Sequence, residues 1–112
     1  REKINALEDA GINTSLVAEI NGRVVGFIMG EVYHGEFGIP EPTALIDTLG
    51  VLPDYQHQGI ASAILEQFIT NIKAIKVDLI HTLTNWNDLS SLKFFHRRGF
   101  KPSQRINLEL YI

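Results

Sequence analysis

Residues 49–62 carry the clearest chemical pattern in the sequence, Leu-Gly-Val-Leu-Pro-Asp-Tyr-Gln-His-Gln-Gly-Ile-Ala-Ser. The pattern predicts the end of a strand, a short turn and the start of a long helix, with Gly59 and Ala61 at the helix start. Small residues there let a ligand approach the backbone, and the first amides of a helix have no acceptor within it. Together with the helix dipole they favour an anion such as phosphate. The alternative is that Gly59 and Ala61 only allow close packing of the helix against the strand, and the loop alone leaves both interpretations open.

Other reactive motifs are absent from the sequence. It has no Gly-Lys-Ser/Thr and no Gly-x-Gly-x-x-Gly after a predicted strand, which excludes the triphosphatase loop and the dinucleotide-binding loop. It has no cysteine, which excludes disulfides, a thiol nucleophile and Cys-ligated metals. Its His, Asp and Glu residues lack the spacing of metal ligands, so we expect no metal.

Asp47 is the ionisable residue whose position most suggests chemistry, because it lies in an otherwise apolar predicted strand over 43–52. Side chains alternate along a strand, so Asp47 is expected on the same face as Leu49 and Val51. If that face lines a cleft, a desolvated Asp47 serves as a base, directly or through water. The alternative is an Asp that is hydrogen-bonded to the backbone of a neighbouring loop.

The elements that position these residues follow from hydrophobic spacing and turn residues. In chain order the sequence predicts a helix end over 3–10, strands over 16–20 and 24–33, a loop over 34–42, a strand over 43–52, a helix over 58–75, a strand over 77–83, a helix over 88–98 and a strand over 106–112. Asn21-Gly22 predicts a tight hairpin turn. Gly50 within a strand favours a bulge or a close backbone approach. The strand–helix–strand crossover is expected to be parallel and right-handed, which gives a mixed α/β three-layer fold.

Composition and charge limit the class of protein. The 112 residues are 45% hydrophobic and 21% charged, as in one globular domain over 1–112. A net charge of −3 argues against nucleic acid and anionic membrane as partners. No apolar run reaches the roughly 20 residues of a membrane span and no signal peptide is recognisable, so we expect a cytoplasmic protein. The chain starts with Arg1 and its only methionine is Met29, so we expect it to be incomplete at the N-terminus.

Three segments together resemble the GNAT superfamily of N-acetyltransferases. Residues 56–61, Gln-His-Gln-Gly-Ile-Ala, resemble its Q/R-x-x-G-x-G/A signature, and residues 51–55 resemble its V-x-P-x-Y lead-in. Residues 88–100 are similar to its N-x-x-A-x-x-x-Y-x-x-x-G-F stretch. The element order matches from the family's second strand onward, so the resemblance implies that the first strand and first helix are missing. It also implies an α/β/α sandwich whose mixed, mostly antiparallel sheet has a central, splayed parallel strand pair.

The resemblance implies that acetyl-CoA is the cosubstrate and that its acetyl group moves directly to an amine of an unidentified small molecule or protein. Backbone amides of residues 58–62 would hold the pyrophosphate, and Leu49 and Val51 would pair with the pantetheine arm. The N–H of Leu49 or Gly50 is then the candidate donor to the acetyl oxygen. The cofactor-binding residues implied in this way are Leu49, Gly50, Val51, Gln56, His57, Gln58, Gly59, Ile60, Ala61, Ser62, Asn87, Asp88 and Phe95.

The sequence departs from the family at two of these positions. The Tyr that usually protonates the leaving thiolate is replaced by Phe95, which has no exchangeable proton, and the family's Asn is replaced by Asp88, with Asn85 and Asn87 close by. Either the thiolate leaves unprotonated, or another group serves, or the register is shifted by one residue. A non-catalytic CoA-binding or regulatory module on the same fold therefore stays an alternative, as does an interaction domain that has lost the cofactor.

Two further expectations concern the surface. His57 either flanks the ligand or is solvated, and Arg97 and Arg98 are expected at a solvated helix end. Without the family's first strand, the sheet should expose an edge, and such an edge allows a homodimer.

Overall fold

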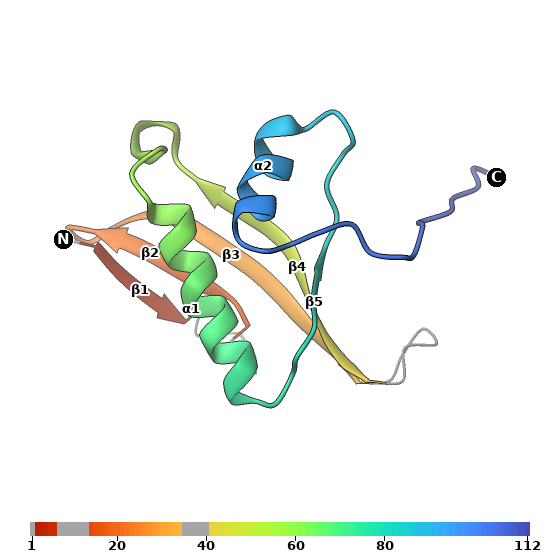
Figure 1. The fold of residues 1–112 in the computed structure, drawn as a ribbon. Coiled ribbons are helices and arrows are strands. Elements are labelled where there is room, and N and C mark those ends of the chain that lie inside the picture. Colours follow the sequence, from red (N-terminus) through yellow and green to blue (C-terminus); the bar gives the residue numbers. More distant parts are fainter. Residues whose placement is uncertain (1, 7–13, 35–40) are drawn as a thin grey trace.

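The computed structural model describes residues 2–6, 14–34 and 41–112, which form one mixed sheet with helices on it (Figure 1). The strands are β1 (Glu2–Ala6), β2 (Leu16–Ile20), β3 (Arg23–His34), β4 (Pro42–Val51) and β5 (Ile80–Thr82). The helices are the 3₁₀ helix η1 (Pro53–Tyr55) and the α-helices α1 (Ile60–Ala74) and α2 (Leu89–Arg97). The strands lie in the order β1-β2-β3-β4-β5, antiparallel from β1 to β4 and parallel between β4 and β5. The predicted α/β class and the mixed, mostly antiparallel sheet are confirmed.

The hairpin between β2 and β3 turns where the sequence predicts. Asn21 and Gly22 both have positive φ, 53° and 82°, which a tight hairpin turn requires. The turn sets the pairing of Ile20 with Arg23 and of Glu19 with Val24. A register shift between Ala18 and Glu19 then places Ala18 opposite Gly26 and Leu16 opposite Ile28, on the face that α1 covers.

Helix α1 supplies one side of the core, and its apolar residues recur at the predicted helical spacing. Its buried residues pack against apolar side chains of β2, β3 and β4. The core residues of α1 are Ile60, Ile64, Leu65, Phe68 and Ile72. Glycine on β3 makes the close approach possible: a Cβ at Gly30 would lie 2.6 Å from Cε1 of Phe68, and one at Gly26 would lie 3.0 Å from Cδ1 of Ile64.

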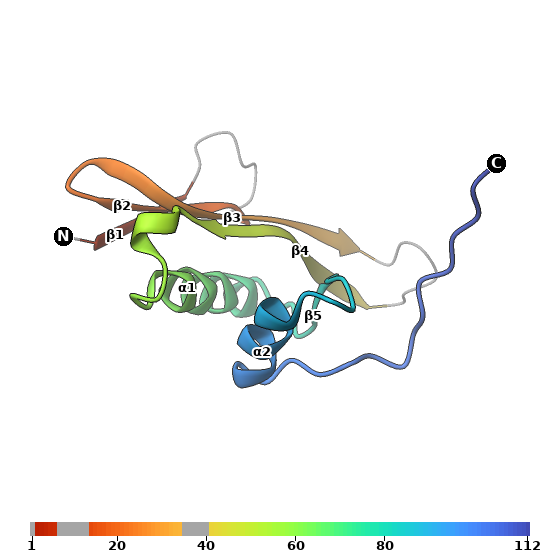
Figure 2. The same ribbon diagram turned by 90° about the horizontal axis from the view of Figure 1, so that it is seen from above.

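Both α-helices lie on the same side of the sheet (Figure 2). Phe94, Phe95 and Phe100, in α2 and just after it, pack against the same core as α1. Residues 2–6, 14–34 and 41–112 therefore make two layers, and no helix among them covers the opposite face of the sheet.

Three predicted segments differ from the structure. The helix end over 3–10 is wrong for its first part, because residues 3–6 belong to β1 and pair antiparallel with β2; residues 7–10 lie outside the described part. Backbone pairing with a neighbouring strand outweighs a helical period that is only one turn long. Because β1 covers β2, the sheet edge lies at β1 instead of β2. The loop over 34–42 is shorter, since β3 includes His34 and β4 begins at Pro42, with 35–40 outside the described part.

The strand predicted over 106–112 is also wrong. These residues alternate apolar and polar side chains, but they have no strand partner, and the chain runs away from the domain in Figure 1. Ile106, Leu108 and Leu110 are all more than 80% exposed. Alternation indicates a strand only where a partner strand supplies hydrogen bonds, and β5, at this end of the sheet order, is only three residues long.

Candidate active site

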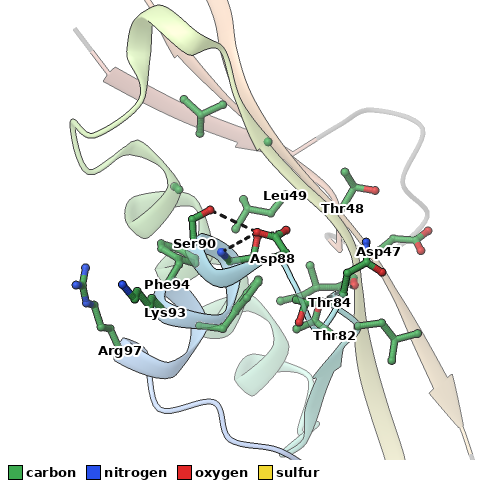
Figure 3. Close-up of a pocket in the computed structure, with 18 of the residues that line it drawn as sticks. Asp47, Thr48, Leu49, Thr82, Thr84, Asp88, Ser90, Lys93, Phe94 and Arg97 are labelled. Carbon is green, nitrogen blue, oxygen red and sulfur yellow. Dashed lines mark hydrogen bonds between the residues drawn. The ribbon is translucent and has the colours of Figure 1, made fainter. Parts of the chain in front are cut away.

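A cleft opens where β4 and β5 separate. The two strands pair only over Ala44–Ile46 and Ile80–Thr82, and the Thr82 hydroxyl donates to the carbonyl of Ile46 at 3.1 Å at the end of this pairing. Beyond it, β4 continues beside β3 alone, while the chain after β5 turns toward α2. The space between them, called here the β4–β5 cleft, has a volume of about 1150 Å³ and is lined by β4, residues 55–62, residues 82–86, α2 and part of residues 105–109 (Figure 3). The predicted splayed strand pair is thus present.

A β-bulge at Asp47 determines which backbone groups of β4 face this cleft. Gly30 of β3 pairs with Ile46 but Met29 pairs with Thr48, so Asp47 is the extra residue. Of the two expectations for Gly50, a bulge or a close approach, the bulge is wrong. Gly50 is instead a site of close approach, since a Cβ there would lie 2.9 Å from Cε1 of Phe27.

The bulge reverses the alternation along β4. Leu52 donates its N–H to Val25 of β3, so Gly50, two residues earlier, also points its backbone groups at β3. Leu49 and Val51 then point theirs the other way, into the cleft. The carbonyl of Val51 accepts a hydrogen bond from Nε2 of Gln56 at 3.0 Å, as this direction requires.

The loop between β4 and α1 is folded by its own hydrogen bonds. Pro53 begins η1, and Gln58 donates its Nε2 to the carbonyl of Asp54 at 3.2 Å. His57 and Gly59 both adopt left-handed backbone, with φ of 63° and 81°. Glycine accepts this conformation freely, but for a residue with a Cβ it is strained, so His57 is an unusual choice here.

The start of α1 presents unpaired amides to the cleft. Gly59 is the N-cap and has no side chain to accept from the first turn, and the first amide that bonds back is that of Ala63, to the Gly59 carbonyl at 3.0 Å. Helix geometry therefore leaves the amides of Ile60, Ala61 and Ser62 without an intrahelical acceptor. These three residues line the cleft, an arrangement whose helix-end amides and dipole favour an anion.

Asp88 caps the start of α2 on the opposite wall of the cleft. Its carboxylate accepts from the Ser91 hydroxyl at 2.8 Å, the Ser91 amide at 3.2 Å and the Ser90 hydroxyl at 3.4 Å (Figure 3). The hydrogen bonds from the side chain and then the backbone of Ser91 hold the pKa of Asp88 below its ordinary value. Asp88 is therefore an ionised acceptor at neutral pH and has no proton to donate.

Phe95 lines the cleft from α2 and is fixed by aromatic contacts. Its ring packs edge-to-face against Phe94, with centroids 5.2 Å apart, and against Phe100, at 5.0 Å. It offers the cleft an apolar surface and no exchangeable proton.

Known proteins share both the sequence pattern and the fold of this chain. Among protein-family models, that of the Acetyltransferase (GNAT) family matches residues 2–100. The chain belongs to this family. Its relatives include N-alpha-acetyltransferase 60 of Xenopus tropicalis, 28% identical over 104 residues, and acetyltransferase ECA0875 of Pectobacterium atrosepticum, 29% identical over 93 residues. The matches cover 77% and 83% of this chain but only 42% and 61% of those two proteins.

Solved structures of other family members share the fold. The aminoglycoside acetyltransferase AAC(6')-Iy, in complex with the bisubstrate analogue CoA-S-monomethyl-acetylneamine, superposes with a TM-score of 0.75 at 17% identity, covering 88% of this chain and 68% of that chain. A ribosomal-protein-alanine N-acetyltransferase from Brucella melitensis biovar Abortus 2308 gives 0.72 at 14%, covering 87% and 72%. At these identities the likeness shows the fold alone.

Within this GNAT chain the structure gathers most of the sequence-predicted residues around one cleft. These are Asp47, Leu49, Gly50, Val51, Gln56, His57, Gly59, Ile60, Ala61, Ser62, Asp88 and Phe95. The side chains of Gln58 and Asn87 are not among the cleft-lining residues, whereas that of Asn85 is.

Asp47 does not share the face of Leu49 and Val51, because the bulge breaks the alternation on which that expectation rested. Leu49 and Val51 pack against the core, while Asp47 is exposed. Its carboxylate points away from Leu49 and from Asp88 (Figure 3). Asp47 thus borders the cleft in contact with solvent, and it lacks the desolvation on which the sequence-based role of a base depended.

The sequence analysis missed the basic residues of α2. Lys93 and Arg97 line the cleft, and Arg98 donates to the Ser62 hydroxyl while its guanidinium lies 5.4 Å from the centroid of the Phe94 ring. Arg98 therefore links the end of α2 to the first turn of α1 rather than only facing solvent. The i, i+4 spacing of Lys93 and Arg97 shows in the sequence that they share a helix face, but the packing of α2 decides what that face meets.

Proposed function

We propose that this GNAT chain carries an acetyl-CoA-dependent N-acetyltransferase, which moves the acetyl group directly from the thioester to the amine of an acceptor. One observation carries the proposal: a single cleft joins the unpaired amides of α1 to the outward-facing backbone of β4. The first feature suits the phosphates of a nucleotide-bearing thiol, and the second suits an extended arm that pairs like a strand.

Different residues along the cleft bind different parts of acetyl-CoA. The amides of Ile60, Ala61 and Ser62 take the pyrophosphate, and the backbone of Leu49 and Val51 pairs with the pantetheine arm in the place that β5 leaves open. The Leu49 N–H then donates to the acetyl carbonyl oxygen, where negative charge develops during attack. Gly50 is unsuited to that role because its N–H is directed at β3.

The reaction also needs two proton transfers, and only the first is assigned to a residue of the protein. An ammonium cannot attack, so the acceptor must lose a proton first. We assign this step to Asp47 acting through water, since Asp47 borders the cleft in contact with solvent while its carboxylate points away from Leu49 and does not reach the amine directly. As the tetrahedral intermediate collapses, the C–S bond breaks and sulfur leaves as a thiolate. Phe95 has no proton to supply, so solvent protonates the thiolate.

The first test is thermal unfolding with acetyl-CoA, CoA and ATP in parallel. A ligand at about 100 times its Kd adds roughly 2.7 kcal/mol to the free energy of unfolding, which raises the Tm of a chain of this size by several degrees. We expect a shift with both CoA species and none with ATP. No shift with any of them would refute the proposal.

A pair of variants ties that shift to the proposed site. Ala61→Glu adds a carboxylate at the first turn of α1 and should abolish the shift. Gln67→Glu adds the same charge at an exposed position of the same helix away from the cleft, and should keep it. Equal shifts in the two variants would place the ligand elsewhere.

The aromatic packing of Phe95 favours a second candidate, a CoA-binding module without transfer activity. An assay for free CoA in the presence of amines separates the two: the enzyme releases CoA, and the module binds without releasing it. No single acceptor is proposed, since the names of the solved neighbours refer both to ribosomal-protein alanine and to aminoglycosides.

A cytoplasmic location is proposed on composition. Among the described residues, neither α-helix has the length and apolarity to span a membrane.

A further inference from the structure

Two cations on one face of α2 have no partner within the described residues. Lys93 and Arg97 are exposed and line the β4–β5 cleft, and no ion pair or side-chain hydrogen bond engages either of them there. They lie one helical turn apart, where like charges repel and destabilise an isolated helix. Arg97 is favoured by the C-terminal end of the helix dipole, but Lys93, in the middle of α2, is not. An anion between the two would remove the repulsion.

A contact between α2 and α1 determines where this pair lies relative to the first turn of α1. Arg98, the next residue, donates to Ser62 in the first turn of α1 and packs over Phe94. This contact holds the end of α2 beside the unpaired amides of Ile60 and Ala61. Lys93 and Arg97 and those amides therefore face the same end of the cleft from two different elements.

The charges in the cleft are also separated. In Figure 3, Lys93 and Arg97 project from one side of α2, while Asp88, at the start of α2, and Asp47, on β4, lie toward the other side. Arg105 and Glu109, from the segment after α2, add one charge of each sign. The anionic end of a ligand is accordingly favoured at Lys93 and Arg97, and disfavoured near β4.

Coenzyme A carries two separate anionic groups, a pyrophosphate and a ribose 3′-phosphate. The amides of the α1 turn are neutral donors in one place and match the first group. A phosphate monoester carries nearly two negative charges at neutral pH and is best matched by a pair of cations. Resting on the proposed function, we infer that Lys93 and Arg97 bind the 3′-phosphate and thereby select coenzyme A over its dephospho form.

The test compares the Kd of CoA and of 3′-dephospho-CoA, measured by calorimetry on the whole chain. Wild type should bind CoA about tenfold or more tightly, because hydrogen bonds to charged groups are worth that much. Lys93→Gln with Arg97→Gln should bring the two Kd values within about twofold by weakening CoA alone. Lys73→Gln with Lys101→Gln removes the same charge from exposed positions that do not line the cleft, and should keep the preference.

Each other outcome overturns the inference in a recognisable way. Equal Kd values in wild type would show that the 3′-phosphate is not recognised, while CoA binding, and so the proposed function, would stand. If the Kd of CoA and that of dephospho-CoA rise equally in the cleft variant, the two cations act on the pyrophosphate or through long-range electrostatic attraction. Failure of wild type to bind either ligand would refute the proposed function together with the inference. Retained binding of dephospho-CoA shows that the variant is folded.

Discussion

At the scale of single residues, the loop before α1 contains two residues with left-handed backbone, and one of them has a Cβ. Gly59 accepts its positive φ without cost, but His57 takes the same region of backbone conformation two residues earlier. A residue with a Cβ pays roughly 1–2 kcal/mol there. The imidazole lines the cleft and is exposed, so no packing in the described core compensates for the strain.

We therefore predict that His57→Gly stabilises the protein. Relief of the left-handed strain is partly offset by the extra chain entropy that glycine loses on folding, leaving a gain of roughly 0.5–1 kcal/mol in the free energy of unfolding. Urea denaturation measures it. The matched control is His96→Gly, in the regular helix α2, which should lower the same free energy by roughly 0.3 kcal/mol. A loss of stability in His57→Gly would mean that the imidazole makes stabilising contacts in the free protein.

Sequence reasoning identified residues whose type alone defines their chemistry. The unpaired amides near Gly59 follow from a glycine at a helix start, and the lack of a proton on Phe95 follows from its identity. The exposure of Asp47 and the role of Arg98 could not be predicted in this way. Both depend on which neighbour a side chain meets, and that is decided by a bulge in one case and by helix packing in the other.

At the scale of elements, two glycines of the sheet each allow a side chain to lie close to the backbone: Phe68 at Gly30 and Phe27 at Gly50. Gly30 lies under α1, where an added Cβ would be 2.6 Å from Cε1 of the fully buried Phe68 and 3.0 Å from the backbone oxygen of Thr14. Gly50 lies on β4, where the nearest atoms to an added Cβ would belong to the ring of Phe27, which is 36% exposed. The ring of Phe27 can move into solvent, whereas Phe68 is held by the core.

This difference predicts unequal costs for the same substitution. Gly30→Ala should lower the free energy of unfolding by roughly 1–3 kcal/mol, as overpacking of a core does, and Gly50→Ala by less than about 1 kcal/mol. Both values come from chemical denaturation monitored by circular dichroism. Equal losses would show that the two neighbours yield to the same extent, and that helix α1 can shift on the sheet.

The same two glycines show why the elements were only partly predictable. The spacing of apolar residues in the sequence predicts the strands β2 to β5 and both α-helices, and their order. Because glycine is a poor strand former, Gly50 indicated either a bulge or a close approach; the structure has the close approach there and the bulge at Asp47. A bulge is a property of the pairing between two strands, and β4 alone does not contain that information.

At the scale of the whole molecule, the order of elements was sufficient to predict an α/β fold with a parallel crossover, because few topologies satisfy it. The layers were harder to predict, since the side of the sheet that a helix covers depends on which face is apolar along several strands at once. The ends of the chain were least predictable. Residues 2–6 and 106–112 have similar short patterns, but 2–6 find a partner strand in β2, and 106–112 find none.

The unpaired segment 106–112 has a consequence for the molecule in solution. Its apolar side chains at 106, 108, 110 and 112 are exposed, and β5 lies at the end of the described sheet with its outer edge unoccupied. An exposed segment with alternating apolar residues and a free sheet edge favour pairing between copies of the chain. We predict that this 112-residue chain self-associates with rising concentration, and that Leu108→Lys with Leu110→Lys keeps it monomeric in sedimentation velocity.

Asn107→Lys with Glu109→Lys alters the polar side of the same segment and should still associate, because the apolar side is intact. Wild type that stays monomeric at every concentration, or two variants that behave alike, would show that the segment is not the contact.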